Sequence, residues 1–185
     1  MDGEPLFDVL DLMKKLERDL AVLYIMAANS IHDAAVSSVM RKIGVESATH
    51  NYIVTLIEPL IRECPPKKVM DNETLMTIEK SIKEAINQVD SLIDYVRTKQ
   101  KLGDSDLADA ILEKLDELEA YEENAVKIYS FLLRSYLPIT STRADAKYRA
   151  VSKLIVKLLK GIADDEREHK ELLESVNEVL GRTRG

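Results

Sequence analysis

The sequence is poor in the residues that define several common classes of protein. It has a single cysteine, Cys64, which excludes an intrachain disulfide framework, a Cys₄ zinc site and a rubredoxin-type iron site. It has no basic run and its formal charge is −7, so binding to nucleic acid or to an anionic membrane is not expected. No apolar stretch approaches the roughly 20 residues that a membrane helix needs, and the N-terminus has no secretion signal. A soluble cytoplasmic protein is therefore expected.

Glycine and proline are also scarce, with six and five residues respectively, and alternating β-branched runs are few. Apolar residues instead recur at helical spacing, so the chain is predicted to be all-α. The helix breakers indicate a single domain with two helix pairs, 1–64 and 105–181, and a long helix over about 72–101 between them. Asp33 is a predicted N-cap, and Pro59 is expected to kink or end the second helix.

Four of the predicted helices carry acids or histidines where their apolar stripes should continue. These residues are Glu17 in the first helix, Glu46 or Ser47 and then His50 in the second, Glu122 in the fourth, and Asp165 or Glu166 and then His169 in the fifth. No lysine or arginine lies on the same stripes, and an unpaired buried carboxylate costs several kcal/mol. If the stripes converge, metal ions at their meeting point are the simplest explanation.

The two helix pairs also repeat each other. The segments "ERDLAVLY" (17–24) and "EENAVKIY" (122–129) align Glu with Glu and Tyr with Tyr at an offset of 105. The segments "ESATH" (46–50) and "DEREH" (165–169) align at an offset of 119. The difference of 14 residues falls in the connection before the last helix, where an insertion costs little. The repeat indicates a duplicated helix pair around a two-fold-symmetric site.

These residues resemble the motifs of the ferritin-like di-iron carboxylate superfamily, which includes rubrerythrins, ferritins and bacterioferritins. That superfamily places one Glu on each of two helices and Glu-x-x-His on each of the other two. The resemblance implies a ferritin-like four-helix bundle, with the long additional helix in the crossover between the helix pairs. It implies two iron ions, or manganese as an alternative. With Glu46 included as a candidate, the expected metal ligands are Glu17, Glu46, His50, Glu122, Glu166 and His169. Tyr24 and Tyr129, each seven residues after a ligand Glu, are candidate hydrogen-bond partners of the ligands.

One position departs from the superfamily pattern. Ser47 stands three residues before His50, where the superfamily has a metal-bridging Glu. Glu46 lies on the same helix face and is a candidate replacement ligand. The other outcomes are that one metal position is weak, or that the site has a different metal or chemistry. Asp165, at the matching position of the fifth helix, and Glu119 are further candidate ligands.

The resemblance implies a metal pair that reacts with dioxygen or peroxide, as an oxidoreductase or peroxidase or as a ferroxidase. Because the chain has no rubredoxin-type module, electrons are expected from an external donor. Two alternatives stay open. One is a metal-poor ferritin-like helical interaction protein with a degenerate site, which Ser47 favours, and the other is a di-iron hydroxylase. A homodimer through the exposed side of the third helix is also left open.

Overall fold

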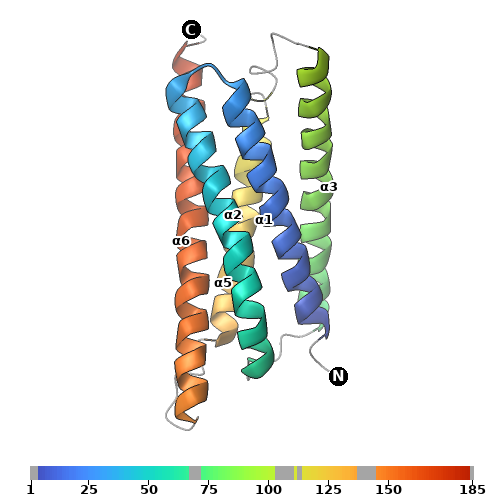
Figure 1. Cartoon of the computed structure of the whole chain (residues 1–185), viewed down its shortest axis with the longest axis vertical. Helices are drawn as coiled ribbons and strands as arrows, with labels where there is room; N and C mark the ends of the chain where they lie inside the picture. The colour runs from blue at the N-terminus through green and yellow to red at the C-terminus, as the bar shows by residue number, and fades with distance from the viewer. Residues whose placement is uncertain (1–3, 67–71, 103–110, 112–113, 137–144, 184–185) are drawn as a thin grey trace.

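Figure 1 shows the computed structural model of the chain, which describes residues 4–66, 72–102, 111, 114–136 and 145–183. These residues contain five long α-helices and no β-strand, which confirms the predicted all-α class. The helices are α1 (Glu4–Ser30), α2 (Ala34–Glu63), α3 (Asn72–Leu102), α5 (Leu115–Tyr136) and α6 (Ala146–Thr183). Within the part of the chain that is described, none of the helices is long and apolar enough to span a bilayer.

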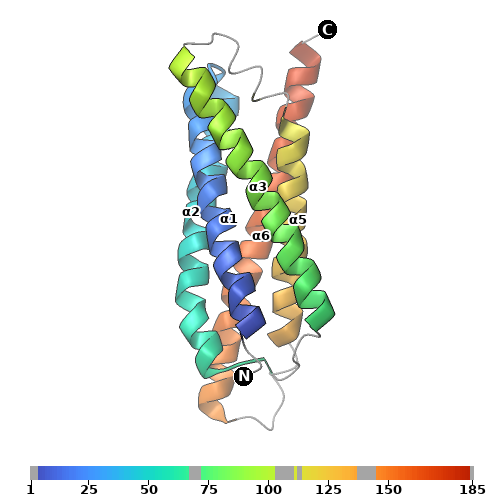
Figure 2. The ribbon, with the colours of Figure 1, turned by 90° about the vertical axis from the view of Figure 1, so that its right-hand side faces the viewer.

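The helices lie side by side in two antiparallel pairs with one further helix. α1 packs against α2, and α5 packs against α6. α2 also packs against α6, which joins the pairs, while α3 packs against α1. Figure 2 shows α3 passing in front of the two pairs. α1, α3 and α6 run in one direction, and α2 and α5 run in the opposite direction (Figure 1). The middle of the molecule is therefore bounded by α1, α2, α5 and α6.

Local sequence explains how α2 begins and how far it extends. The Asp33 side chain accepts a hydrogen bond from the Val36 N–H at 2.9 Å, which confirms Asp33 as the N-cap. Pro59 lies inside α2, which continues to Glu63, so this proline does not end the helix. Pro59 lies near the C-terminal end of α2, so only the last helical turn follows it.

The limits of the second helix pair differ from the prediction. α6 continues to Thr183, so the predicted stop at Gly181 was wrong by two residues. Glycine permits helical dihedral angles as well as left-handed ones, and its presence alone does not end a helix. The predicted start of this pair, Ser105, lies outside the described residues, and α5 is described from Leu115.

The inward faces of the helices form a continuous apolar core. α1 and α2 approach each other closely at Gly44, where an added Cβ atom would lie 3.0 Å from Cγ1 of Ile25 and 3.2 Å from the carbonyl oxygen of Ala21. A larger residue at this position would push the two helices apart. The small residue thus permits the close spacing of α1 and α2, the helices that carry Glu17 and His50.

Candidate metal centre

Five acidic and imidazole side chains meet in the middle of the four-helix arrangement, where each is at most 3% exposed. They come from all four helices: Glu17 from α1, His50 from α2, Glu122 from α5, and Glu166 and His169 from α6. The helical spacing that turns the apolar residues of each helix inward turns these residues inward too. The four interrupted stripes of the sequence therefore converge.

The five side chains form two groups that could each hold a metal ion. The first ligand group is Glu17, His50 and Glu166, and the second is Glu122, Glu166 and His169. Within each group, one ligand atom from every residue lies within 4.8 Å of the others. Glu166 belongs to both groups. Its Oε1 is 2.5 Å from Nδ1 of His50, and its Oε2 is 3.7 Å from Nδ1 of His169.

The other two glutamates take matching positions beside the two histidines. Oε2 of Glu17 lies 3.7 Å from Nδ1 of His50, and Oε2 of Glu122 lies 3.4 Å from Nδ1 of His169. The imidazole rings are stacked, with their centroids 5.7 Å apart. Both histidines thus turn Nδ1 toward the shared carboxylate, and the two halves of the centre have the same arrangement, as the repeat in the sequence indicates.

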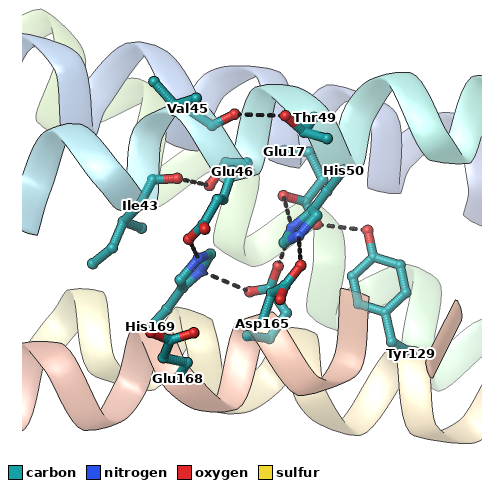
Figure 3. A network of polar contacts seen from close by, with 12 residues as sticks. Glu17, Ile43, Val45, Glu46, Thr49, His50, Tyr129, Asp165, Glu168 and His169 are labelled. Atoms are coloured by element: carbon teal, nitrogen blue, oxygen red, sulfur yellow. Dashed lines mark hydrogen bonds and ion pairs between the residues drawn. The ribbon is translucent and has the colours of Figure 1, made fainter. Parts of the chain in front are cut away.

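The outer nitrogen of each imidazole contacts an acid on the opposite helix pair (Figure 3). Nε2 of His169 lies 2.9 Å from Oε2 of Glu46, and Nε2 of His50 lies 3.1 Å from Oδ2 of Asp165. The Glu46 and Asp165 side chains are 31% and 45% exposed and lie outside both ligand groups. A carboxylate that accepts the outer N–H of a histidine fixes the orientation of the ring and directs the other nitrogen inward. The structure thus places the candidate ligands Glu46 and Asp165 at the outer edge of the histidines.

The two predicted tyrosine partners also bond across the helix pairs. The Tyr129 hydroxyl donates to Oε1 of Glu17 at 2.6 Å, and the Tyr24 hydroxyl donates to Oε1 of Glu122. Burial and the charge of Glu122 raise the pKa of Tyr24 well above its usual value, and burial and Glu17 do the same for Tyr129. Both phenols therefore keep their protons at neutral pH. Each holds one oxygen of a glutamate, and the other oxygen of that glutamate faces the Nδ1 atom of a histidine.

Ser47 is the point at which the two halves of the centre differ. It is 1% exposed and corresponds, at the offset of 119, to the shared Glu166. Its hydroxyl donates to the carbonyl oxygen of Ile43 on the same helix at 3.1 Å. The centre therefore has one carboxylate between the histidines where a symmetric repeat would have two. The side chain of the other candidate ligand, Glu119, lies outside the described residues.

The pKa values of both histidines and of Glu166 are raised above their usual values. Burial opposes the charged form of His50, but Glu166 and Glu17 outweigh burial and raise its pKa to about 11. Burial opposes the charged form of His169 as well, and Glu122 and Glu166 raise its pKa to about 10. Burial, together with the charges of Glu17 and Glu122, raises the pKa of Glu166 to about 8. Protons therefore balance the carboxylate charges at neutral pH, and they occupy atoms that a cation would also bind.

The donor atoms of the first ligand group fit a metal ion. Oε2 of Glu17, Nδ1 of His50 and Oε1 of Glu166 are buried and have no hydrogen-bond partner. Buried polar atoms are normally satisfied, so three unsatisfied atoms in one group require an explanation. Nδ1 of His50 and Oε1 of Glu166 approach each other to 2.5 Å as an ion pair, and a cation bound in this group would contact both atoms. In the described part of the chain, the glutamates of the centre form ion pairs with the histidines and with no lysine or arginine.

Searches against protein-family models, curated proteins and solved structures found no match to this chain. The function is therefore inferred from the residues and distances of the centre. Sequence patterns had identified every residue of the two ligand groups as a candidate, but not the contact between Asp165 and His50. At the offset of 119, Glu46 corresponds to Asp165 and His50 corresponds to His169. The contact of Glu46 with His169 therefore predicts the equivalent contact of Asp165 with His50.

Proposed function

We propose that this chain is a ferritin-like di-metal carboxylate protein that binds two iron ions, or two manganese ions, and reacts with dioxygen or peroxide. The observation that carries the proposal is the pair of buried Glu/His groups that share Glu166. A single buried Glu/His contact is common in helical proteins. Two such groups, related by a repeat in the sequence and joined by one carboxylate, are the arrangement that a pair of metal ions requires.

The order and direction of the helices support the ferritin-like part of the proposal. The connection between the two antiparallel pairs contains α3, and α2 and α5 run in the same direction. In ferritin-like folds one long crossover joins the two helix pairs, and the ligands project inward from all four helices. Here the ligands project from α1, α2, α5 and α6, and α3 contributes none among the described residues.

The donor types favour iron or manganese. Both ligand groups consist of carboxylate and imidazole, with no thiolate, a combination that suits these metals better than copper(I) or structural zinc. Glu17 and His50 would hold one ion, Glu122 and His169 the other, and Glu166 both. When bound, two iron(II) ions supply the two electrons that reduce hydrogen peroxide to water.

The remaining residues of the centre have positioning roles. Tyr24 and Tyr129 hold Glu122 and Glu17 in place through their hydroxyl groups. Glu46, like Asp165, accepts the outer N–H of a histidine and keeps Nδ1 directed inward. Burial of the ligands keeps bulk water away, and this strengthens their attraction for cations.

The proposal is tested by the metal content of the full chain. Protein is loaded anaerobically with iron(II) or manganese(II), separated from unbound metal and analysed by mass spectrometry of the elements. We expect about two metal ions per chain, as in other four-helix carboxylate sites. The Glu171→Gln variant, which changes an exposed acid of α6, is the matched control and should bind the same amount. Absence of metal above trace levels in the wild type would contradict the proposal.

Assays with added iron(II) and with hydrogen peroxide then distinguish a ferroxidase from a peroxidase. A ferroxidase continues to oxidise iron(II) added beyond the amount that the centre binds. A peroxidase instead consumes hydrogen peroxide only while an electron donor is present, and iron oxidation stops at the bound ions. In the second case the assay supplies the electron donor, because these 185 residues contain a single cysteine and cannot form a Cys₄ rubredoxin site.

Ser47 favours a second candidate, a metal-poor ferritin-like interaction protein. Its hydroxyl bonds to its own helix, and among the described residues Glu166 is the one carboxylate that both ligand groups share. This candidate predicts that the wild type contains no metal after loading, whereas Ser47→Glu, which adds the missing carboxylate, acquires metal. Wild-type protein that already binds two ions would exclude it.

A further inference from the structure

Polar contacts of the two ligand groups lead to solvent at two places on the seam between α2 and α6, which Figure 3 shows. At the first place Asp165 contacts His50, and at the second place Glu46 contacts His169. The side chains of these two acids are 45% and 31% exposed. Among the described residues, the other polar contacts of the ligands are with one another and with two buried tyrosines. We call the two places the His50 edge and the His169 edge, and we expect metal ions to enter at one or both of them.

The His169 edge is closed by a lysine. Nζ of Lys42 lies 2.6 Å from Oε2 of Glu46, the oxygen that also contacts His169, and 3.3 Å from Oε1 of Glu168. Because Lys42 belongs to α2 and Glu168 belongs to α6, the ammonium group bridges the seam. An incoming metal ion would therefore meet a carboxylate that already holds a cation, at a point where the two helices are tied together.

The repeat of the chain provides no such bridge at the His50 edge. At the offset of 119, Lys42 corresponds to Gly161, and Glu168 corresponds to Thr49. Gly161 has no side chain, and a Cβ atom added to it would meet open space, with nothing within 4 Å. The Thr49 hydroxyl donates to the carbonyl oxygen of Val45 on its own helix at 3.0 Å. The two edges are equivalent in the repeat, but they differ in the lysine bridge across the seam.

The His50 edge also leads to the ligand atoms that lack partners. In the described part of the chain, Asp165 forms an ion pair with His50 and with no lysine or arginine. Behind this contact, the first ligand group contains three buried atoms without a hydrogen-bond partner. In the second ligand group, Nδ1 of His169 and Oε2 of Glu122 are hydrogen-bonded at 3.4 Å. An ion that enters at the His50 edge therefore reaches donor atoms that are not engaged in hydrogen bonds.

We propose that divalent metal ions enter the centre at the His50 edge, past Asp165, and that Lys42 keeps the His169 edge closed. The inference rests on the proposed metal centre and adds the path by which ions reach it. The exposed carboxylate of Asp165 attracts a cation. At the His169 edge, a cation would first have to displace the ammonium group of Lys42 from Glu46 and break its bridge to α6.

Two reciprocal substitutions test the path. Stopped-flow absorption follows uptake of cobalt(II) by the metal-free full chain, because this ion binds carboxylate and imidazole sites more tightly than manganese(II) or iron(II) does. Gly161→Lys places a lysine four residues before Asp165, as Lys42 stands four residues before Glu46, and should slow uptake. Lys42→Gln opens the His169 edge and should speed uptake. Each change should be about fivefold, the effect of one charge on a divalent ion about 8 Å away in water. Both changes should vanish in about 1 M salt, which screens charges beyond about 3 Å.

Two further variants control for side-chain volume and for charge. Gly161→Gln adds a side chain without charge at the same position. Lys147→Gln removes a lysine whose ion pair with Glu63 also joins α6 to α2. Glu63 lies 13 residues beyond His50 on α2, which corresponds to about 20 Å along the helix. Both controls should take up cobalt(II) at the wild-type rate, and circular dichroism confirms that each variant is folded.

The rates and the final metal content separate the path from the proposed function. At saturation the wild type and all four variants should contain about two ions per chain, because Lys42, Gly161 and Lys147 lie outside both ligand groups. Two bound ions with equal uptake rates for Gly161→Lys and Gly161→Gln, or for Lys42→Gln and Lys147→Gln, would overturn the path alone. A wild type without bound metal would overturn the path and the proposed function together.

Discussion

Replacing Glu166 by glutamine is expected to have opposite effects on folding and on metal binding. Glutamine has nearly the same size and shape, so the packing is kept, but it cannot ionise. Glu166 is 1% exposed, and burial together with Glu17 and Glu122 raises its pKa to about 8. In metal-free protein the wild-type residue therefore lowers the free energy of unfolding at neutral pH. In the proposed metal-loaded protein the same residue would be the ligand that both groups share.

The size of the folding effect follows from the pKa of Glu166, which rises from 4.5 to about 8. Between these values the folded state holds a proton that the unfolded state releases. The free energy of unfolding therefore falls as pH rises, by about 1.4 kcal/mol per pH unit. The loss is almost absent below pH 4.5 and reaches on the order of 3 kcal/mol at pH 7. Metal-free Glu166→Gln should then be roughly 2 to 3 kcal/mol more stable than the wild type at pH 7, and about equally stable at pH 4.5.

Urea denaturation after removal of metal by a chelator measures this difference at the two pH values. The exposed Glu171→Gln variant is the control and should match the wild type at both. Calorimetric titration with manganese(II) measures the second effect, and Glu166→Gln should lose binding at both positions. The reasoning would be refuted by a variant that is less stable than the wild type at pH 7, or by one that still binds two ions.

Three further changes test other contacts of the centre. Tyr129→Phe leaves an oxygen of the buried Glu17 without its donor, so urea unfolding should show a loss of about 1 to 3 kcal/mol, and a change below about 0.5 kcal/mol would show that this bond does not stabilise the fold. Glu46→Ala removes the acceptor of the outer His169 N–H, so manganese affinity should fall about 10- to 100-fold with two ions still bound. Loss of one ion would instead identify Glu46 as a ligand. Because the pKa values of both histidines and the shared glutamate lie above 7, metal uptake at pH 7 should release about three protons per chain. Calorimetry in buffers of different ionisation enthalpy measures this number, and release of none would contradict the protonation of the centre.

The all-α class could be predicted because apolar residues recur at helical spacing over long stretches with few breakers. Helix ends were predicted less well, since they depend on local hydrogen bonds as well as on residue type. Asp33 caps α2 as its side chain predicts, whereas Gly181 does not end α6. The packing of α3 against α1 was not predicted, because an apolar stripe shows that a helix face is buried and does not show which helix covers it.

The residues of the centre could be predicted from the sequence, except that two helices each offered two adjacent residues for one position. Successive residues on a helix are about 100° apart, so a stripe permits either of two adjacent positions to face inward. The spacing left Glu46 or Ser47, and Asp165 or Glu166, as alternatives. In the structure Ser47 and Glu166 face inward, while Glu46 and Asp165 lie at the edge and contact histidines. The rotation of each helix about its axis decides between them, and packing sets that rotation, as at Gly44 between α1 and α2.

Anomalous X-ray diffraction from crystals of the manganese- or iron-loaded full chain tests the proposed centre most directly. The proposal predicts two anomalous peaks in each chain, one contacted by Glu17 and His50 and the other by Glu122 and His169, with Glu166 in contact with both. Crystals of loaded protein with no anomalous peak among these side chains, or with peaks only at surface acids, would contradict it.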